Sequence, residues 1–502
     1  MTKSVYRSSM AGCLLLGALA CGLNGAFSHH GFDGYDLSPM IDSGWRVYSG
    51  QVPGRDFLVT FPPSHYLLTA LMFRVFGVSW HALVVGASCF FGMMLLLGLR
   101  LAALVRKVYG EDAAVCVAVA FTAGQIIFLL PYSTIWHATI AMDFAMYGIG
   151  ATYLLAGQGR AGLRREAMAH LSFAVAFLLL SKANTAYPTI VLCLIVAGMC
   201  SVGRRGLLLI AGGGLVMASL ALWMVHITLF GMLASYGGLA GRLLPIGFFY
   251  AILYYRNDVI ALSNLLVYAI MAPALVMVLA HAWKTRTRPV VVLGAGSILI
   301  ALLAMGTNIQ FKLSDTPLML LGFVLIAWSG GASYVRMKRR VMFTVFTLTL
   351  VALYFGRTRM AFVASGEWNT EGCTQVAFQD AFLGAITGCP VMQTTLSEVD
   401  RTLAENPGAK VFFGSGLEFL YAGRMRPSPG GIPNWWHPGT SYPLVKGDEI
   451  GAAWTRDQFD VLIFNAAEYR EQMPAGIGAA IDREYMRVDD TTYAIHVYKL
   501  RR

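Results

Sequence analysis

Four aspartates lie close together near the N-terminus of this 502-residue chain, at Asp33, Asp36, Asp42 and Asp56. A carboxylate can act as a general base that takes a proton from a hydroxyl group, especially where partial burial raises its pKa toward neutral pH. The stretch around them contains several glycines and a Pro-Pro pair, which is the composition of a loop. These acids are therefore candidates for proton-transfer chemistry, provided that neighbouring elements hold them in place.

Apolar segments flank this loop and continue through most of the chain. Hydrophobic residues make up 57% of the sequence and charged residues only 13%, which is typical of a polytopic membrane protein. We predict about eleven transmembrane helices from the runs long enough to cross a bilayer. These runs lie near 10–27, 80–105, 112–131, 138–156, 167–181, 185–202, 206–230, 262–283, 289–306, 316–334 and 341–356. The first run lacks a convincing cleavage site, so we expect a retained helix and not a signal peptide.

Clusters of Lys and Arg occur at every second connection between these runs, near 106–107, 160–165, 204–205, 284–288 and 336–340. Because positively charged loops stay in the cytoplasm, this alternation predicts a cytoplasmic N-terminus. The loop at 28–79 and everything after Gly356 then lie on the opposite side of the membrane. The same pattern accounts for the net charge of +11 without a nucleic-acid partner.

The C-terminal part of the chain has a different composition. Charged residues become more frequent, and β-rich runs at 410–413, 460–465 and 493–500 alternate with helical patterns at 396–404 and 466–481. We therefore predict a transmembrane domain at 1–356, with its external loop at 28–79, and an extracytoplasmic α/β domain at 357–502. Cys373 and Cys389 lie in the second domain, where they can form a disulfide in an oxidising compartment; the alternative is two buried free thiols.

The first external loop is longer than a connection needs to be, at about 50 residues, and such loops are usually functional. Two stretches within it, at 41–48 and 66–76, are amphipathic. We expect these stretches to lie at the membrane interface.

The residues of this loop resemble the first external loop of bacterial GT-C glycosyltransferases, integral membrane enzymes of the dolichyl-phosphate-mannose and aminoarabinose-transferase type. The resemblance rests on the spacing of Asp36, Gly44, Gly50, Pro53, Asp56, Phe57, Pro62 and Pro63. Three other features agree with this resemblance: the segment VFGVSW before the second span, Asp143 at the outer start of the fourth span, and LLLSKANTAYP at 178–188. The last of these is similar to the TKGP segment of the family. Two features depart from the family pattern. Leu37 follows Asp36 where many members have a second acid, and the segment around Lys182 lacks its glycine.

The resemblance implies a polyprenyl-phosphate sugar as the donor, because neither nucleotide sugars nor ATP occur outside the cytoplasm. An acceptor hydroxyl would attack the anomeric carbon with inversion while a carboxylate takes its proton. We assign that base to Asp36, with Asp33 as the alternative. Direct displacement needs no carboxylate nucleophile, so we expect Asp56 to position the acceptor or organise the loop. The alternative for Asp56 is a turn residue that bonds its own backbone.

Basic residues near the outer helix ends are candidates for holding the phosphate leaving group. Lys182 lies at the end of an apolar run, Arg256 lies in YYRND just before another, and Lys312 is a third candidate. For Lys182 the alternative is a lysine that extends its ammonium group to the membrane interface.

Further residues on the predicted outer side are candidates for contacts with the sugar or acceptor: Tyr35, His65, Asp143, Trp435 and Trp436. For the two tryptophans the alternative is packing onto their own domain. No set of His, Asp and Glu has the spacing of metal ligands, so we expect no catalytic metal, although some GT-C enzymes use one. We expect no cofactor apart from the donor substrate.

These features predict an enzyme of the bacterial inner membrane that moves one pentose or hexose to a periplasmic glycan, to lipid A or to a protein such as a pilin. Three other classes remain open. A transporter or flippase of lipid-linked glycans usually shows repeats and charges at mid-membrane. A polysaccharide polymerase or ligase usually has its large catalytic loop late in the chain, and an envelope scaffold would not need the Asp36 to Asp56 pattern.

Overall fold

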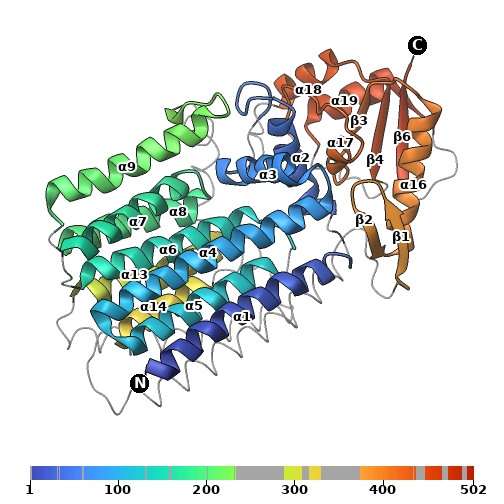
Figure 1. The fold of residues 1–502 in the computed structure, drawn as a ribbon. Coiled ribbons are helices and arrows are strands. Elements are labelled where there is room, and N and C mark those ends of the chain that lie inside the picture. Colours follow the sequence, from blue (N-terminus) through green and yellow to red (C-terminus); the bar gives the residue numbers. More distant parts are fainter. Residues whose placement is uncertain are drawn as a thin grey trace. The chain divides into compact units, whose positions relative to one another are not determined.

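The computed structural model, drawn in Figure 1, describes most of the chain. The described residues are 3–30, 32, 34–58, 61–130, 133–157, 161–200, 202–230, 232, 288–307, 316–328, 373–433, 435–436, 447–465, 473–488 and 494–501. By its internal contacts the chain forms two compact units. The helical unit comprises Met1–Leu23, Ser88–Ala221 and Leu243–Gly356, and the mixed unit comprises Asn24–Ala87, Leu222–Arg242 and Arg357–Arg502. The first external loop thus shares a unit with the C-terminal region, while the division into domains 1–356 and 357–502 stays a prediction.

Long apolar helices dominate the helical unit. They are α1 (Lys3–Phe27), α4 (Trp80–Tyr109), α5 (Glu111–Leu129), α6 (His137–Ala156), α7 (Ala161–Leu179), α8 (Ala183–Met199), α9 (Gly203–Trp223), α13 (Arg288–Thr307) and α14 (Thr316–Trp328). Among the described residues, five helices (α1, α4, α5, α6 and α9) are long and apolar enough to cross a membrane. The polytopic helical class is confirmed. The number of eleven spans stays a prediction, and the runs at 262–283 and 341–356 lie outside the described residues.

Helix α6 lies at the centre of the helical unit. It contacts α5, α7, α8, α13 and α14, and its most apolar stretch is fully buried. Two glycines permit this close packing, because an added Cβ at Gly148 or Gly150 would come to 3.3 Å from Ala174 or Leu101. Small residues of this kind let helices approach each other closely within a membrane.

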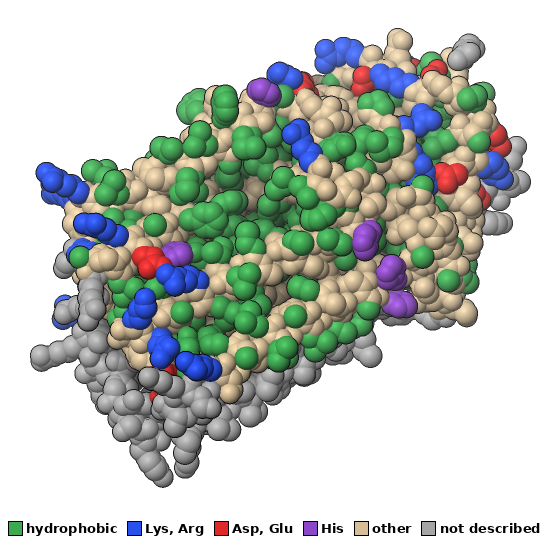
Figure 2. Space-filling view, in the orientation of Figure 1, with side chains coloured by type: hydrophobic (Ala, Val, Ile, Leu, Met, Phe, Trp, Pro, Cys, Tyr) green, Lys and Arg blue, Asp and Glu red, His purple; other side chains and the backbone are tan. Residues whose placement is uncertain are grey.

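Helices α1 and α9 expose apolar side chains instead. Each is only 22% buried over its most apolar stretch, and Leu15, Leu208 and Leu209 are among the most exposed side chains. In the face shown in Figure 2, hydrophobic side chains cover much of the surface over the helices. Such a surface is suited to contact with lipid, because the side chains are apolar and a helix satisfies its own backbone hydrogen bonds.

The mixed unit contains a four-stranded sheet in the order β3 (Val411–Phe413), β4 (Val461–Asn465), β6 (Ile495–Leu500), β5 (Tyr485–Arg487). Strands β3 and β4 run parallel, whereas β6 is antiparallel to both β4 and β5. Every position of β4 is buried, which explains its continuous apolar sequence. The predicted strands at 410–413, 460–465 and 493–500 correspond to β3, β4 and β6. Strand β5 was not predicted; only the first of its three residues is buried, so it lacks the continuous apolar run of β3.

Within the described ranges, four helices accompany this sheet: α16 (Pro390–Glu405), α17 (Phe419–Gly423), α18 (Gly447–Arg456) and α19 (Ala475–Glu484). Side chains of α18, α19 and the sheet form one core in which Trp454, Leu462 and Ile477 are fully buried. The predicted helix at 396–404 lies within α16. The helix predicted at 466–481 overlaps α19, and residues 466–472 of that prediction lie outside the described residues.

A separate β-hairpin precedes α16. Strands β1 (Val376–Asp380) and β2 (Gly384–Gly388) pair antiparallel, with Val376 opposite Gly388. The structure joins Cys373 to Cys389 by a disulfide, which closes the open end of this hairpin. The predicted disulfide is confirmed, and the alternative of two free thiols is wrong.

The first external loop contains two helices that pack on each other, α2 (Gly34–Tyr48) and α3 (Pro63–Phe76). Helix α2 is buried continuously from residue 37 to residue 47. The polar side chains of α2 are bonded within the mixed unit, and the placement of 41–48 at the membrane interface stays a prediction. Helix α3 does expose apolar side chains at Leu71, Val75 and Phe76, and its placement at an interface stays a prediction.

Candidate active site

Asp36 is the third residue of α2, so its backbone lies in the first helical turn. The amide groups of a first helical turn have no partners within the helix. The side chains of Tyr35 and Asp36 and the whole of Asp33 lie outside the described residues. The choice of Asp36 over Asp33 as the base therefore stays a prediction.

One face of α2 is bonded to the segment that contains α17 and the residues after it. Ser38, Asp42, Trp45 and Arg46 follow helical spacing, and each contributes its side chain to this face. Their partners are Glu418, Arg426, Ser428 and Pro429, and we call these eight residues the latch.

The latch contains a buried ion pair between Asp42 and Arg46, one helical turn apart. Arg46 Nε donates to Asp42 Oδ2 at 2.7 Å, and the two side chains are 1% and 0% exposed. Arg46 also donates to the carbonyl of Pro429, and Ser428 donates its hydroxyl to Asp42. Burial raises the pKa of Asp42, while Arg46 and Ser428 oppose that change. A buried pair of this kind depends on such additional hydrogen bonds.

The other end of the latch joins Ser38 to Glu418. The Ser38 hydroxyl donates to Glu418 Oε2 at 2.7 Å and accepts from the Phe419 amide at 2.9 Å. The Gly416 amide also donates to Glu418 Oε2, at 3.0 Å. Burial nevertheless raises the pKa of Glu418 to about 8, so this carboxyl is largely protonated at neutral pH.

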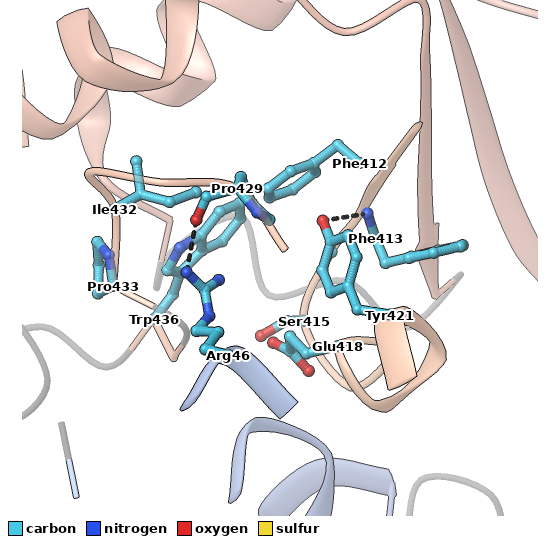
Figure 3. Close-up of a pocket in the computed structure, with 11 residues that line it drawn as sticks. Arg46, Phe412, Phe413, Ser415, Glu418, Tyr421, Pro429, Ile432, Pro433 and Trp436 are labelled. Carbon is cyan, nitrogen blue, oxygen red and sulfur yellow. Dashed lines mark hydrogen bonds between the residues drawn. The ribbon is translucent and has the colours of Figure 1, made fainter. Parts of the chain in front are cut away.

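A small pocket adjoins the latch (Figure 3). Its lining combines Arg46 from α2 and Glu418 with Tyr421 and the rings of Phe412 and Trp436. Polar groups around so small a space can hold an ordered water molecule. Arg46, Glu418 and Pro429 of the latch form part of this lining.

Asp56 lies in a turn and bonds its own neighbourhood. Its Oδ2 accepts from the Val52 amide at 2.7 Å, and Arg55 pairs with both carboxylate oxygens. The hydrogen bond from Arg55 holds the pKa of Asp56 below its usual value. The Asp56 carbonyl also accepts from the Gly431 amide at 2.7 Å. The contact with the Val52 amide is the one expected from the alternative of a turn residue that bonds its own backbone, and a contact of Asp56 with the acceptor stays a prediction.

Two glycines of the loop motif have clear structural reasons. At Gly44 an added Cβ would clash with the Thr69 side chain, so glycine lets α2 approach α3. Gly50 has a φ of 94°, in the region that favours glycine, at the turn after α2.

His65 of α3 is buried. Its Nε2 lies 3.3 Å from the Met40 carbonyl, and no hydrogen-bond partner reaches its Nδ1 in the part of the chain that the structure describes. Burial lowers the pKa of His65 to about 4, so the ring is neutral at neutral pH. A contact of His65 with a sugar or acceptor stays a prediction.

The two tryptophans of the tail pack onto aromatic rings. Trp436 is 5% exposed and stacks on Phe412 with centroids 5.5 Å apart. Trp435 stacks on Phe61 of the first loop at 5.8 Å. The contact of Trp436 is the one expected from packing onto its own domain, whereas Trp435 packs on the first loop. Contact of either ring with a sugar stays a prediction.

Asp143 belongs to the helical unit, where it pairs with Gln125. Gln125 Nε2 of α5 donates to Asp143 Oδ1 of α6 at 2.6 Å, and both residues are buried. Across the described ranges, Asp143 Oδ2 and Gln125 Oε1 have no hydrogen-bond partner. Two unused buried acceptors could receive hydrogen bonds from the hydroxyl groups of a ligand.

The predicted phosphate-binding residues also belong to the helical unit. Lys182 directly precedes α8 as its N-cap residue and is half-buried. Arg256 and Lys312 lie outside the described residues. The roles of all three stay predictions.

Several polar residues of the two units were not predicted from the sequence: Ser38, Arg46, Glu418, Ser428 and Gln125. The spacing of Asp42 and Arg46, four residues apart on a helix, is a local signal that could have found Arg46. The other residues meet partners on different elements of the chain, and no local pattern marks them.

No protein-family model and no curated protein matches the sequence. Solved structures do match. ArnT from Cupriavidus metallidurans in the apo state superposes with a TM-score of 0.50 at 13% identity, covering 97% of this chain and 98% of that one. The chain has the fold of ArnT. This likeness agrees with the fold that the resemblance of the first loop implies.

Two further structures are similar. ArnT from the same organism bound to undecaprenyl phosphate has a TM-score of 0.49 at 12% identity, covering 99% of this chain and 98% of that one. The mycobacterial arabinofuranosyltransferase AftD has a TM-score of 0.47 at 15% identity, covering 99% of this chain and 42% of that one.

Proposed function

We propose that this chain is a GT-C-type glycosyltransferase that moves a single pentose or hexose from a polyprenyl-phosphate donor to a periplasmic glycan, lipid or protein. The observation that carries the proposal is the ArnT fold, which extends over nearly the whole of both chains. The position of Asp36 supports it, because this residue lies in the first turn of a helix that the latch holds.

The proposed reaction is a direct displacement at the anomeric carbon. The acceptor oxygen forms a bond to that carbon, the bond between the carbon and the phosphate oxygen breaks, and the acceptor proton passes to Asp36. Polyprenyl phosphate leaves with the electron pair of the broken bond. One carboxylate is enough for this inverting reaction.

The leaving phosphate carries negative charge that needs donors nearby. We assign this role to Lys182, Arg256 and Lys312. Asp143 and Gln125 are proposed to accept hydrogen bonds from the sugar or the acceptor through their two unused oxygens. No metal or cofactor enters the proposed reaction.

The proposed location is the bacterial inner membrane, with the N-terminus in the cytoplasm and the mixed unit in the periplasm. The Cys373–Cys389 disulfide supports this assignment, because disulfides persist in oxidising compartments such as the periplasm.

The test is sugar transfer from defined polyprenyl-phosphate sugars, in membranes containing wild type or Asp36→Asn. Mass spectrometry of envelope glycans, lipids and proteins would detect the product. We expect a mass increment of one sugar with wild type and its loss in Asp36→Asn, since the amide cannot accept the proton. Asp56→Asn is the matched control and should retain most of the activity.

Other outcomes would change the assignment. An increment that survives in Asp36→Asn but not in Asp33→Asn would move the base to Asp33. No increment with any donor, from a correctly folded protein, would contradict the transferase and favour a transporter of lipid-linked glycans. Addition of a whole glycan would indicate a polymerase or ligase.

A further inference from the structure

The β1–β2 hairpin contacts both ends of the first external loop. One contact is with His29 and His30, which follow α1, and the other is with Trp80, which begins α4. All these residues belong to the mixed unit. The hairpin therefore lies where the chain enters this loop and where it leaves it.

The entry to the loop is held as an added strand. The amide of Thr387 in β2 donates to the His29 carbonyl at 2.7 Å, and His30 forms a parallel bridge with Thr387. His29 Nδ1 lies 2.8 Å from the Ala385 carbonyl. Residues 29–30 thus extend the hairpin by one short strand.

The exit from the loop is held by the hairpin turn. The Trp80 amide, at the start of α4, donates to the Phe382 carbonyl at 2.9 Å. The Trp80 indole donates to the Ser28 carbonyl at 3.0 Å, which joins the exit directly to the entry. The ring of Phe32 packs against Trp80 with centroids 5.4 Å apart. The two ends of the loop and the hairpin turn therefore form one connected group.

The hairpin is itself fixed at both of its ends. At the turn, Asp380 Oδ1 accepts from the amides of Phe382 and Leu383 at 2.8 and 2.9 Å, and its Oδ2 accepts from Arg424 at 2.6 Å. At the open end, the disulfide joins Cys373, before β1, to Cys389, after β2. Each strand has 5 residues, and a hairpin of that length is only marginally stable without such constraints.

We propose that the disulfide-closed hairpin is the positioning element of the first external loop, and that reduction of Cys373–Cys389 loosens both ends of that loop. The effect of reduction on sugar transfer rests on the function proposed above, since this loop carries Asp36. The effect of reduction on the mobility of the loop does not depend on that function. The enzyme would then be active only in a compartment that maintains the Cys373–Cys389 disulfide.

The redox step is a two-electron exchange. An added dithiol gives two electrons and two protons to the disulfide, leaving thiols at Cys373 and Cys389 and becoming a cyclic disulfide itself. The remaining cysteines that the structure describes are free thiols, so among these residues the dithiol has a single target. Reduction frees the open end of the hairpin, so the pairing with residues 29–30 loses its rigid partner. The effect reaches the exit of the loop because the Trp80 indole donates to the Ser28 carbonyl at the entry.

The experiment is hydrogen–deuterium exchange with mass spectrometry on the purified full chain in nanodiscs, with and without dithiothreitol. We expect exchange in peptides covering 28–32 and 77–82 to rise on the order of 10-fold after reduction, because the disulfide restricts local opening. Peptides from α6 should not change. Sugar transfer, measured on the same samples, should fall in parallel and recover on reoxidation.

The double variant Cys373→Ser/Cys389→Ser is the matched control. It should resemble the reduced wild type and show no response to dithiothreitol. Unchanged exchange at 28–32 and 77–82 in the reduced wild type would overturn the proposal. Increased exchange in a protein without any transfer activity would support the hairpin proposal and contradict only the proposed function.

Discussion

The Ser38 hydroxyl donates a hydrogen bond to Glu418 Oε2 across 380 positions of sequence, at 2.7 Å. Ser38 lies two residues after Asp36 on α2, and Glu418 directly precedes α17. The C-terminal part of the chain therefore fixes the helix on which the proposed base lies. Changes in the tail should affect this helix even where they touch no substrate.

Arg46→Ala should strongly destabilise the mixed unit. The substitution leaves Asp42 buried without its cation, and breaking a buried ion pair in this way costs about 3–5 kcal/mol. Thermal unfolding of the purified protein would measure the change. Arg55→Ala is the control, because Arg55 is 68% exposed in its pair with Asp56 and should change the thermal midpoint little. Equal decreases of the thermal midpoint in the two variants would show that the buried pair stabilises the protein no more than the exposed pair.

Glu418 should make stability depend on pH. Its pKa rises from 4.5 unfolded to about 8 folded, so between these values the folded state binds more protons than the unfolded state. The stabilisation is complete below the unfolded pKa, falls as pH rises from about 5 to about 8, and is lost above the folded pKa. The thermal midpoint of wild type, recorded across this range, would show the slope.

Glu418→Gln should flatten that slope. The amide oxygen can still accept from Ser38 and Gly416, but the side chain no longer titrates. Asp42, whose pKa is also raised by burial, remains in both proteins, so the difference between the two curves reports Glu418. Parallel curves for wild type and variant would show that Glu418 does not carry the dependence.

Gly44→Ala should separate α2 from α3. The added methyl group would clash with Thr69, and overpacking of this kind typically costs about 1–3 kcal/mol. Gly25→Ala, in α1, meets nothing within 4 Å and should be neutral or slightly stabilising. Chemical unfolding of both variants would measure the contrast, and a neutral Gly44→Ala would mean that α2 and α3 can move apart freely.

Asp143→Asn tests the proposed ligand contact in the helical unit. The amide keeps the size of the side chain and an oxygen that can accept from Gln125 Nε2, so the thermal midpoint should change little. If the unused Oδ2 receives a substrate hydroxyl, transfer should fall roughly 10-fold, the effect of losing one hydrogen bond. A large loss of stability with unchanged transfer in the surviving protein would assign Asp143 a structural role instead.

The sequence by itself determined the class of the protein and much of its element order. Apolar runs of sufficient length and the alternation of charged connections are local properties, and the helices from α4 to α9 follow the predicted runs. The strands β3, β4 and β6 were also readable, because each is a short apolar run between turn residues. The spacing of the loop motif indicated the fold that ArnT shares.

Only the tertiary structure decided how the first loop is held. The burial of α2 and its latch to Glu418 and Ser428 depend on residues nearly 400 positions apart, and hydrophobic periodicity within either segment contains no information about the other. The same reason hid the pairing of His29 with β2. The partner of Asp143 is only 18 positions away, but it lies on another helix, and the periodicity of each helix does not show which residues of the two face each other. Local sequence sets which elements form, whereas the pairing of buried polar groups is set by the packing of distant segments that must satisfy each other's hydrogen bonds.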